Sequence, residues 1–231
     1  AFVTTQGISS APFDPAVAGQ LRQLLIGAPQ MVAISVLDAS GRVIQDSRAD
    51  QAAASTPLTQ AEIERLRADR SGALQISGLL RIEAAPKDVF AVSRTLTTVA
   101  GKPAGLVVAY VDPAYFAALY RQIGVGADGT IMLLRNDGTA LVRQPAVADS
   151  AVDTAVVARL IAISRDRPVM SALPSDGVAR IVSTHTVGEF PLAIAVGISR
   201  AEALAAWRGD VLATCSTSAL IMGACYLAFR L

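Results

Sequence analysis

The chain has 231 residues, of which 20 are basic and 19 acidic, so its formal net charge is +1. It has no basic stripe interleaved with aromatic residues, which argues against nucleic-acid binding, and its one histidine and two cysteines offer no metal-ligand set. We predict no metal and no cofactor. The sequence has no Ser/His/Asp set and no suitably paired carboxylates, which argues against an enzyme.

The first predicted elements form a β-hairpin followed by a helix. Residues 32–45 read VAISVLDASGRVIQ, which is an apolar run, a polar turn ending in Gly41, and a second, partly apolar run. Aliphatic and β-branched runs around an S-G turn are typical of two antiparallel strands. Farther along, Thr59 and Glu62 form a capping box, which predicts that a helix begins there and continues through EIERLRADR.

A second hairpin and an exit helix follow. Residues 88–105 predict a strand and a glycine-containing turn, and the strand GLVVAYV then runs directly into a helix. That helix begins at Asp112-Pro113, with Asp as the N-cap and Pro at the first helical position. We expect it to end near Gln122.

Three glycines after this helix, Gly124, Gly126 and Gly129, spell G-x-G-x-x-G, the spacing of dinucleotide-binding loops. Such a loop follows a strand and opens a helix, so that the pyrophosphate meets the helix N-terminus. Here a helix precedes the glycines and a strand follows, so we interpret them as a turn. We expect Gly124 to end the helix in a left-handed conformation and Ala127-Asp128-Gly129 to turn into the next strand.

The second half of the chain repeats the order of the first. We predict a hairpin at residues 130–142 and a helix at 153–164. A strand with a turn follows at 177–191, and a strand with an exit helix at 193–207. Ser199 and Glu202 predict a capping box at the start of the last helix. Matching Gly41 to Gly138 and Val111 to Ile198 aligns the two halves. This internal repeat predicts an α+β fold of two modules of about 90 residues, each a central antiparallel sheet with helices.

The C-terminal segment 211–229 contains no charged residue. As a helix it would be about 28 Å long, and a bilayer core is about 30 Å thick. Its first half carries four hydroxyl side chains, which can bond to the helix's own carbonyls. We expect a transmembrane helix, with a buried core helix as the alternative. Trp207 and Arg208 fit an interfacial anchor just before it.

Together these residues resemble the double Cache sensor domains of bacterial membrane receptors, which are two PAS-like modules in tandem. The similarity is carried by APQMVAISVLDASGRVIQDS, FAVSRTL, AGLVVAYVDPAYFAALYRQIGVGADGTIMLLRNDGTALVR and PLAIAVGISRAEALAAWR, which cover most of residues 28–208. The resemblance implies two tandem modules, each an antiparallel sheet flanked by helices, followed by a transmembrane helix.

The resemblance also implies a division of the chain. The expected parts are the end of an N-terminal helix (1–30), a membrane-distal module (31–122) and a membrane-proximal module (123–199). A juxtamembrane helix (200–210) and a transmembrane helix (211–229) follow. A first membrane helix is expected to be missing, because the chain begins with Ala1 rather than Met and shows no signal peptide. We therefore interpret the sequence as a piece of a longer receptor.

In such a receptor, residues 1–208 would lie in the periplasm and the protein would be held in the bacterial inner membrane, as a homodimer. The domain would pass a conformational signal through the C-terminal helix to a cytoplasmic output, a diguanylate cyclase or a histidine kinase. The alternative is a partner-binding or structural ectodomain without a small ligand. That alternative predicts a surface patch in place of an enclosed polar pocket.

The family's ligand pocket lies in the membrane-distal module, between the sheet and the helical middle. Carried over to this sequence, its polar candidates are Arg67, Arg70, Ser93, Arg94, Tyr110 and Asp112. Arginine suits carboxylates because its planar fork binds both oxygens, and tyrosine offers an apolar face with a hydroxyl at its tip. The Tyr/Arg/Trp cluster of amino-acid-binding members is absent around residues 67–81. This argues against an amino-acid ligand and leaves open an organic acid or no ligand.

Each candidate also has a purely structural interpretation. Arg67 and Arg70 lie on a charged helix end, where solvation alone would explain them. Arg94 shares a face of its strand with the inward-facing Phe90 and Val92. An internal ion pair would therefore explain it as well as a ligand contact would. Asp112 is already explained as a helix cap.

Overall fold

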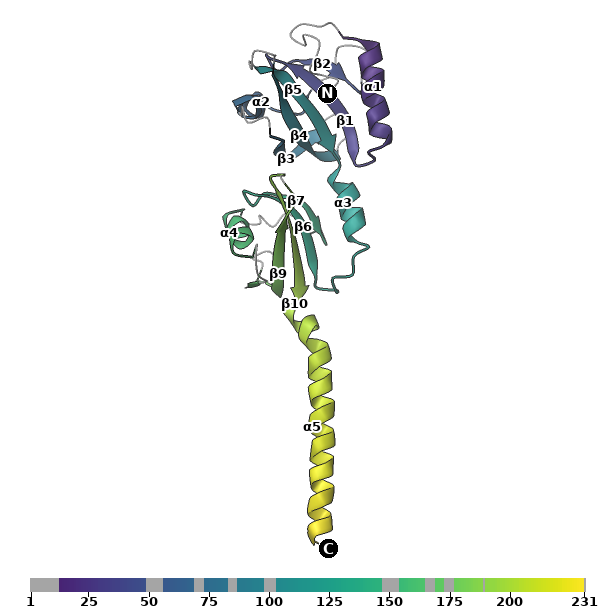
Figure 1. Cartoon of the computed structure of the whole chain (residues 1–231), viewed down its shortest axis with the longest axis vertical. Coiled ribbons are helices and arrows are strands. Elements are labelled where there is room, and N and C mark those ends of the chain that lie inside the picture. Colours follow the sequence, from purple (N-terminus) through teal and green to yellow (C-terminus); the bar gives the residue numbers. More distant parts are fainter. Residues whose placement is uncertain are drawn as a thin grey trace.

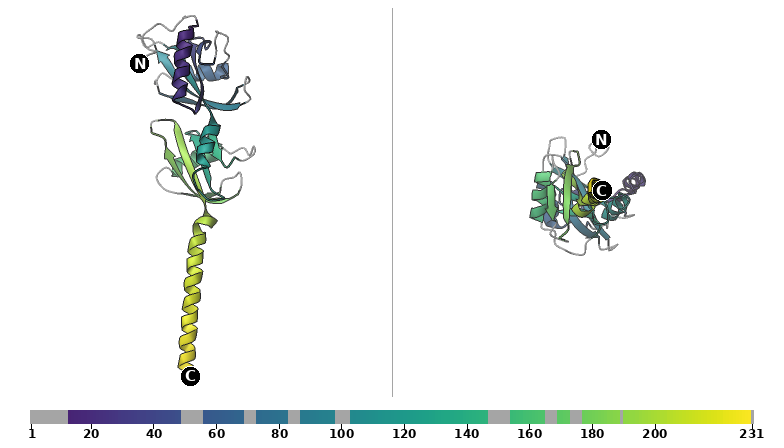
Figure 2. Two further views of the ribbon diagram at one scale, coloured as in Figure 1. Left: turned by 90° about the vertical axis from the view of Figure 1, so that its right-hand side faces the viewer. Right: turned by 90° about the horizontal axis from the view of Figure 1, so that it is seen from below.

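The computed structural model describes residues 13–48, 56–68, 73–82, 87–97, 103–146, 154–164, 169–172, 177–188 and 190–230. Within these ranges the chain forms two five-stranded antiparallel sheets, stacked end to end, and a long C-terminal helix that continues away from the second sheet (Figures 1 and 2). The predicted α+β fold of two sheet modules is confirmed.

The first sheet, which we call the distal sheet, has the strand order β2-β1-β5-β4-β3. Its strands are β1 (Met31–Asp38), β2 (Val43–Asp46), β3 (Gln75–Ile82), β4 (Lys87–Thr97) and β5 (Pro103–Val111). Its helices are α1 (Pro15–Ile26), α2 (Gln60–Ala68) and α3 (Pro113–Tyr120). Helix α2 lies on one face of the sheet and α1 on the other (Figure 1).

The second sheet, the proximal sheet, has the order β7-β6-β10-β9-β8, which is the order of the first sheet repeated. Its elements are β6 (Thr130–Arg135), β7 (Ala140–Gln144), α4 (Thr154–Ser164), β8 (Val169–Ala172), β9 (Ala179–Thr186), β10 (Leu192–Ser199) and α5 (Arg200–Arg230). The glycines that aligned the two halves both turn through left-handed backbone, with φ of 87° at Gly41 and 89° at Gly138. The duplication seen in the sequence is therefore a duplication of topology.

Local capping explains where several helices begin. The Asp14 carboxylate accepts a hydrogen bond from the Ala16 amide ahead of α1, and the Asp112 carboxylate accepts one from the Ala114 amide ahead of α3. In the predicted capping box of α2, the Thr59 amide donates to Glu62 at 2.9 Å and the Glu62 amide donates to the Thr59 hydroxyl at 3.3 Å. The sequence interpretation of the starts of α2 and α3 is confirmed, whereas the cap of α1 at Asp14 was not predicted.

The turn between the modules differs from the prediction. Helix α3 ends at Tyr120 with Arg121 in a right-handed conformation, and the left-handed glycine is Gly126 (φ 86°), not Gly124. The turn at Ala127-Asp128 is present as expected. A strand, β6, follows it, as the interpretation of a turn requires.

Two strands were missed in the sequence. The edge strands β3 and β8 lie between the helical middles and the following strands, in segments where we predicted no strand. In β3, the pairing with β4 shifts between Ile76 and Leu79, where Ser77-Gly78 interrupts the alternation of apolar residues that signals a strand. Strand β8 has only four residues, which is too short for a periodic pattern.

Four apolar clusters hold the modules together. One packs the distal sheet against α2 through Ile63 and Leu66, and another packs its opposite face against α1 through Leu21. A third packs the proximal sheet against α4. The fourth joins the modules, since it contains Phe90 from β4 together with Ile131 from β6.

Helix α5 runs unbroken from Arg200 to Arg230, so Trp207 lies within it and does not end a shorter helix. By length and composition it could cross a membrane, and the apolar window of this helix is not buried against the rest of the described chain. Its hydroxyl groups bond to its own carbonyls as expected: Thr214 donates to the Asp210 oxygen at 2.8 Å and Ser216 to the Ala213 oxygen at 2.9 Å.

Candidate functional site

A buried polar cluster lies on the α2 face of the distal sheet. We call it the distal polar cluster, and it consists of Ser35, Asp46, Arg48, Thr56 and Tyr110. The Asp46 carboxylate accepts a hydrogen bond from the Ser35 hydroxyl at 2.6 Å and is bridged by the Arg48 guanidinium at 2.8 and 3.0 Å. The Tyr110 hydroxyl lies 2.9 Å from the Thr56 hydroxyl, and the Arg48 guanidinium lies 5.4 Å from the centre of the Tyr110 ring.

Strand alternation and register bring these groups together. Side chains two apart on a strand share a face, so Ser35 lies on the same face as Ala33 and Leu37, which pack in the core beneath α2. Ser35 is paired with Asp46 across β1 and β2, and Ala33 is paired with Tyr110 across β1 and β5. The cluster is therefore built from three adjacent strands.

Burial and hydrogen bonding act on the cluster's acidic groups in opposite directions. Burial alone would raise the pKa of Asp46, but hydrogen bonds from Arg48 and Ser35 outweigh it and hold that pKa below its ordinary value. Burial raises the pKa of the Tyr110 phenol, so its hydroxyl stays protonated. Asp46 is thus a carboxylate whose two oxygens are already occupied by groups of the protein.

Two further polar atoms are buried in the same module. The Arg67 Nε on α2 and the Ser93 Oγ on β4 are both buried, and neither has a hydrogen-bond partner among the residues that the structure describes. Ser93 lies on the α2 face, because side chains two apart on a strand share a face and Val89 and Ala91 pack in the core beneath α2. A buried donor without a partner costs about 1–3 kcal/mol, so both groups are candidates to bind a ligand.

The structure brings some of the predicted site residues together and separates others. Tyr110, Ser93 and Arg67 belong to the distal module's α2 side. Arg94 shares the face of Phe90 and Val92, as its position in the strand predicted, but that is the face opposite Ser93, and its side chain is exposed. It therefore does not join the other candidates.

The last two predicted residues lie elsewhere. Asp112 caps α3, and its carboxylate accepts the Ala114 amide at 2.9 Å. Arg70 lies outside the described residues. Within the described ranges, no three His, Cys, Asp or Glu side chains gather as metal ligands.

Sequence reasoning missed Ser35, Asp46, Arg48 and Thr56. Ser35 stands at an inward position of an otherwise apolar strand, and a polar residue there needs a buried partner. Asp46 is only 1% exposed, and it reaches the face of Ser35 because the register between β1 and β2 shifts, so simple alternation along β2 does not predict it. The polar Ser35 in a core strand was the available signal.

A continuous apolar core connects this module to the next. Phe90 of the distal sheet contacts Phe116 of α3, with ring centres 6.4 Å apart, and Phe116 contacts Tyr120, with centres 6.5 Å apart. These rings pack in one cluster with Ile131 and Leu141 of the proximal sheet. A displacement of β4 or α3 would therefore be felt by the second module.

The linker between α3 and β6, residues 121–129, is bonded to the first turn of α5. The Glu202 carboxylate accepts hydrogen bonds from the amides of Ala127 at 2.8 Å and Asp128 at 3.4 Å, and it fills the space beside Gly126. The buried Arg180 donates from Nε to the Asp128 carbonyl at 2.7 Å. Glu202 was predicted to close a capping box with Ser199. Instead Ser199 is the last residue of β10 and Glu202 holds the linker.

The arrangement is two sheet modules of one topology in tandem, and comparison with known proteins relates it to sensor domains. A family model described as a histidine kinase sensor domain, dCache_1_like, matches residues 113–197. A search of curated proteins returned no match.

Solved structures extend the similarity over most of the chain. The extracellular domain of rpHK1S-Z16, described as a histidine kinase, has a TM-score of 0.71 at 27% identity, covering 83% of this chain and 80% of that one. The corresponding domain of mmHK1S-Z3 has a TM-score of 0.65 at 14% identity, covering 90% and 88%. The ligand-binding domain of the Pseudomonas aeruginosa PAO1 amino acid chemoreceptor PctB has a TM-score of 0.54 at 17% identity, covering 87% and 82%. The chain is thus similar in fold to double Cache sensor domains over most of its length, and its residues 113–197 match the sensor-domain model itself.

Proposed function

We propose that the chain is the extracytoplasmic ligand-sensing region of a bacterial transmembrane receptor, and that its ligand is a small organic acid bound on the α2 side of the distal sheet. The observation that carries this proposal is the coincidence there of the distal polar cluster with two buried polar groups, Arg67 Nε and Ser93 Oγ, that have no partner among the described residues.

The charges of the site favour an acid over an amino acid. An amino acid's ammonium group needs a carboxylate or several acceptors, and both oxygens of Asp46 are engaged by Ser35 and Arg48. A ligand carboxylate, by contrast, suits the buried Nε of Arg67 and the hydroxyl of Ser93. The chemoreceptor PctB was solved with L-glutamine, so amino acids belong in the test as well.

The proposed signal leaves the distal module through the joined core and the linker. A ligand that draws α2 toward the sheet would shift β4, which packs through Phe90 on α3. The linker after α3 is hydrogen-bonded to Glu202, so the same displacement would reach the first turn of α5. Packed cores of this kind convert small shifts into one of two discrete arrangements.

The receptor around this domain is also part of the proposal. We propose the domain boundaries 1–30, 31–122, 123–199, 200–210 and 211–229, with residues 1–208 in the periplasm, residues 211–229 of α5 in the inner membrane, and a homodimer as the working unit. Of the two expected outputs, a histidine kinase has the better support, since the matching family model and rpHK1S-Z16 both describe sensor domains of histidine kinases.

The test is a binding screen on the full chain in detergent micelles. Thermal unfolding followed by circular dichroism is measured with succinate, malate, acetate, L-glutamine and L-isoleucine, and any compound that raises the midpoint is titrated by calorimetry. We expect a dicarboxylate to bind, and Arg67→Gln to weaken its affinity at least about tenfold. The matched control is Arg159→Gln, an exposed arginine on α4, the equivalent helix of the proximal module.

Binding that survives both Arg67→Gln and Ser93→Val would place the ligand elsewhere and contradict the proposed pocket. If none of the compounds binds, the domain does not sense small organic acids of the kind tested. A partner-binding ectodomain then becomes the better description.

A further inference from the structure

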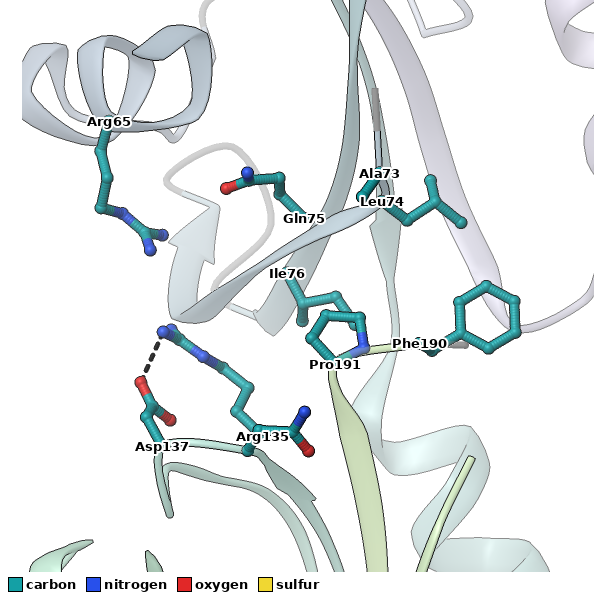
Figure 3. Close-up of a pocket in the computed structure, with 10 residues that line it drawn as sticks. Arg65, Ala73, Leu74, Gln75, Ile76, Arg135, Asp137, Phe190 and Pro191 are labelled. Carbon is teal, nitrogen blue, oxygen red and sulfur yellow. Dashed lines mark hydrogen bonds and ion pairs between the residues drawn. The ribbon is translucent and has the colours of Figure 1, made fainter. Parts of the chain in front are cut away.

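A pocket lies between the two modules, away from the distal polar cluster. Its volume is about 430 Å³, within the range of small-molecule sites. Figure 3 shows the residues around it, which come from α2 and β3 of the distal module and from two turns of the proximal module. They are Arg65, Ala73, Leu74, Gln75, Ile76, Arg135, Asn136, Asp137, Phe190 and Pro191.

Two arginines from different modules point into this pocket. The guanidinium groups of Arg65 and Arg135 converge from opposite sides (Figure 3). Arg135 pairs with Asp137 at 2.6 Å, whereas Arg65 makes no ion pair with the residues that the structure describes. The lining residues thus include two arginines and one carboxylate, so they carry one excess positive charge, and only Arg135 is paired with that carboxylate.

The remaining walls are apolar or rigid. Ile76 lies on the distal side, and Phe190 and Pro191 lie on the proximal side, where the Asn136 amide donates to the Pro191 carbonyl at 3.2 Å. That hydrogen bond holds the β6–β7 and β9–β10 turns together, so the proximal wall is preformed. A ligand for this pocket needs an anionic end for the arginines and an apolar body for Ile76 and Pro191, which lie nearest to them (Figure 3).

We propose that the inter-module pocket is a second ligand site, which takes a small monocarboxylate with an apolar or aromatic body. Its carboxylate lies between Arg65 and Arg135, and its body lies against Ile76 and Pro191. The site bridges the two modules, so occupancy stabilises one arrangement of the modules relative to other arrangements. It does not depend on a ligand in the distal polar cluster.

The test uses the full chain in detergent micelles and three probes of related shape. Phenylacetate carries both required features, acetate lacks the apolar body, and phenylacetamide lacks the charge. Calorimetric titration is expected to show phenylacetate binding at least about tenfold more tightly than either of the others. Weaker binding of phenylacetate than of acetate, or no binding of phenylacetate, would overturn the proposal.

Variants locate the site. Arg65→Gln and Arg135→Gln are each expected to weaken phenylacetate binding about tenfold or more, and Arg159→Gln to leave it unchanged. Asp137→Asn removes the competing carboxylate while keeping an acceptor for the Thr139 amide, so it is expected to tighten binding several-fold. A gain of affinity cannot come from loss of folding.

Ser93→Val separates this proposal from the previous one. It is expected to leave phenylacetate binding unchanged, because Ser93 does not line the inter-module pocket. If Ser93→Val abolishes phenylacetate binding and the two arginine variants do not, the ligand occupies the distal module. The inter-module site is then wrong, while the proposed function stands.

Discussion

The two modules share one topology but bury different chemistry beneath the helices α2 and α4. Ser35 of β1 aligns with Met132 of β6, and Tyr110 of β5 aligns with Gly197 of β10, with the same strand partners in each sheet. Ser35 is bonded to Asp46, whereas Met132 is fully buried in an apolar cluster with Val157 of α4.

The difference assigns the two modules different tasks. A polar cluster under α2 leaves groups that a ligand can bind, and it holds the distal module together less tightly than continuous packing would. The apolar layer under α4 makes the proximal module a stiff connection between the linker and α5, since packed interiors transmit displacement. Under the proposed function, the distal copy of the fold is the receptor and the proximal copy is the spacer.

The largest expected effect on stability comes from replacing Met132 in the proximal core with serine, the residue type at the aligned position Ser35. Met132→Ser would leave a cavity and an unbonded hydroxyl in the α4 cluster, and we expect a loss of about 3–4 kcal/mol in the free energy of unfolding. Urea unfolding of the full chain, followed by circular dichroism, measures it. The reference change is Ser35→Ala, expected to cost about 1 kcal/mol because Asp46 keeps its Arg48 pair. Equal costs for the two variants would show that the proximal face is not a continuous apolar layer.

The next effect compares the two acid–arginine pairs. Asp46→Asn breaks a pair whose carboxylate is buried and is expected to cost about 2–3 kcal/mol, whereas Asp137→Asn breaks a pair at an exposed turn and is expected to cost less than about 1 kcal/mol. The same unfolding measurement applies. A smaller cost for Asp46→Asn than for Asp137→Asn would contradict a buried structural role for Asp46.

The cost of Asp46→Asn also depends on pH in a definite direction. The pKa of Asp46 is lower in the folded chain than in the unfolded chain, so its contribution to stability is present above the unfolded pKa, near 3.8. That contribution is lost as pH falls through the folded pKa. Urea unfolding at stepped pH should therefore show wild type and Asp46→Asn converging below about pH 4, and a constant difference down to low pH would refute this role.

A smaller effect is expected where the linker meets α5. Glu202→Gln weakens the hydrogen bonds to the amides of Ala127 and Asp128, so we expect those amides to exchange about tenfold faster, for a local loss of about 1–1.5 kcal/mol. Hydrogen exchange resolved by mass spectrometry checks this. The matched control is Glu62→Gln, which weakens the capping box of α2 and is expected to leave linker exchange unchanged. Unchanged linker exchange in Glu202→Gln would remove this contact from the proposed signalling route.

The fold was largely predictable from the sequence because its turns and caps are local. Gly41 and Gly138, and the caps at Thr59 and Asp112, depend on neighbours a few residues away. The site was harder, because Asp46 and Tyr110 meet only through the pairing of three strands. Glu202 shows the same limit: a capping box is the local expectation, but tertiary packing gave its carboxylate to amides 74 and 75 residues earlier.

The smallest expected stability effect separates the two modules at one aligned position. Ser93 of β4 and Thr184 of β9 face their helices at equivalent places, since Ser93 pairs with Val108 and Thr184 with the aligned Ala195. The Thr184 hydroxyl donates to the Ile161 carbonyl of α4 at 3.3 Å, whereas the Ser93 hydroxyl has no partner among the described residues. The first hydroxyl is structural, and the second is a candidate for ligand binding.

Replacing each residue with valine tests that distinction. Thr184→Val leaves the Ile161 carbonyl without its donor and is expected to cost about 1 kcal/mol, with no effect on binding. Ser93→Val removes a buried hydroxyl that has no described partner, so its stability is expected to stay within about 0.5 kcal/mol of wild type, while affinity for an acid in the distal site falls at least about tenfold. Urea unfolding and calorimetry on the same samples give both quantities. If Ser93→Val is strongly destabilised and binding is unaffected, Ser93 is a structural residue, and the contrast between a receptor module and a spacer module loses its clearest marker.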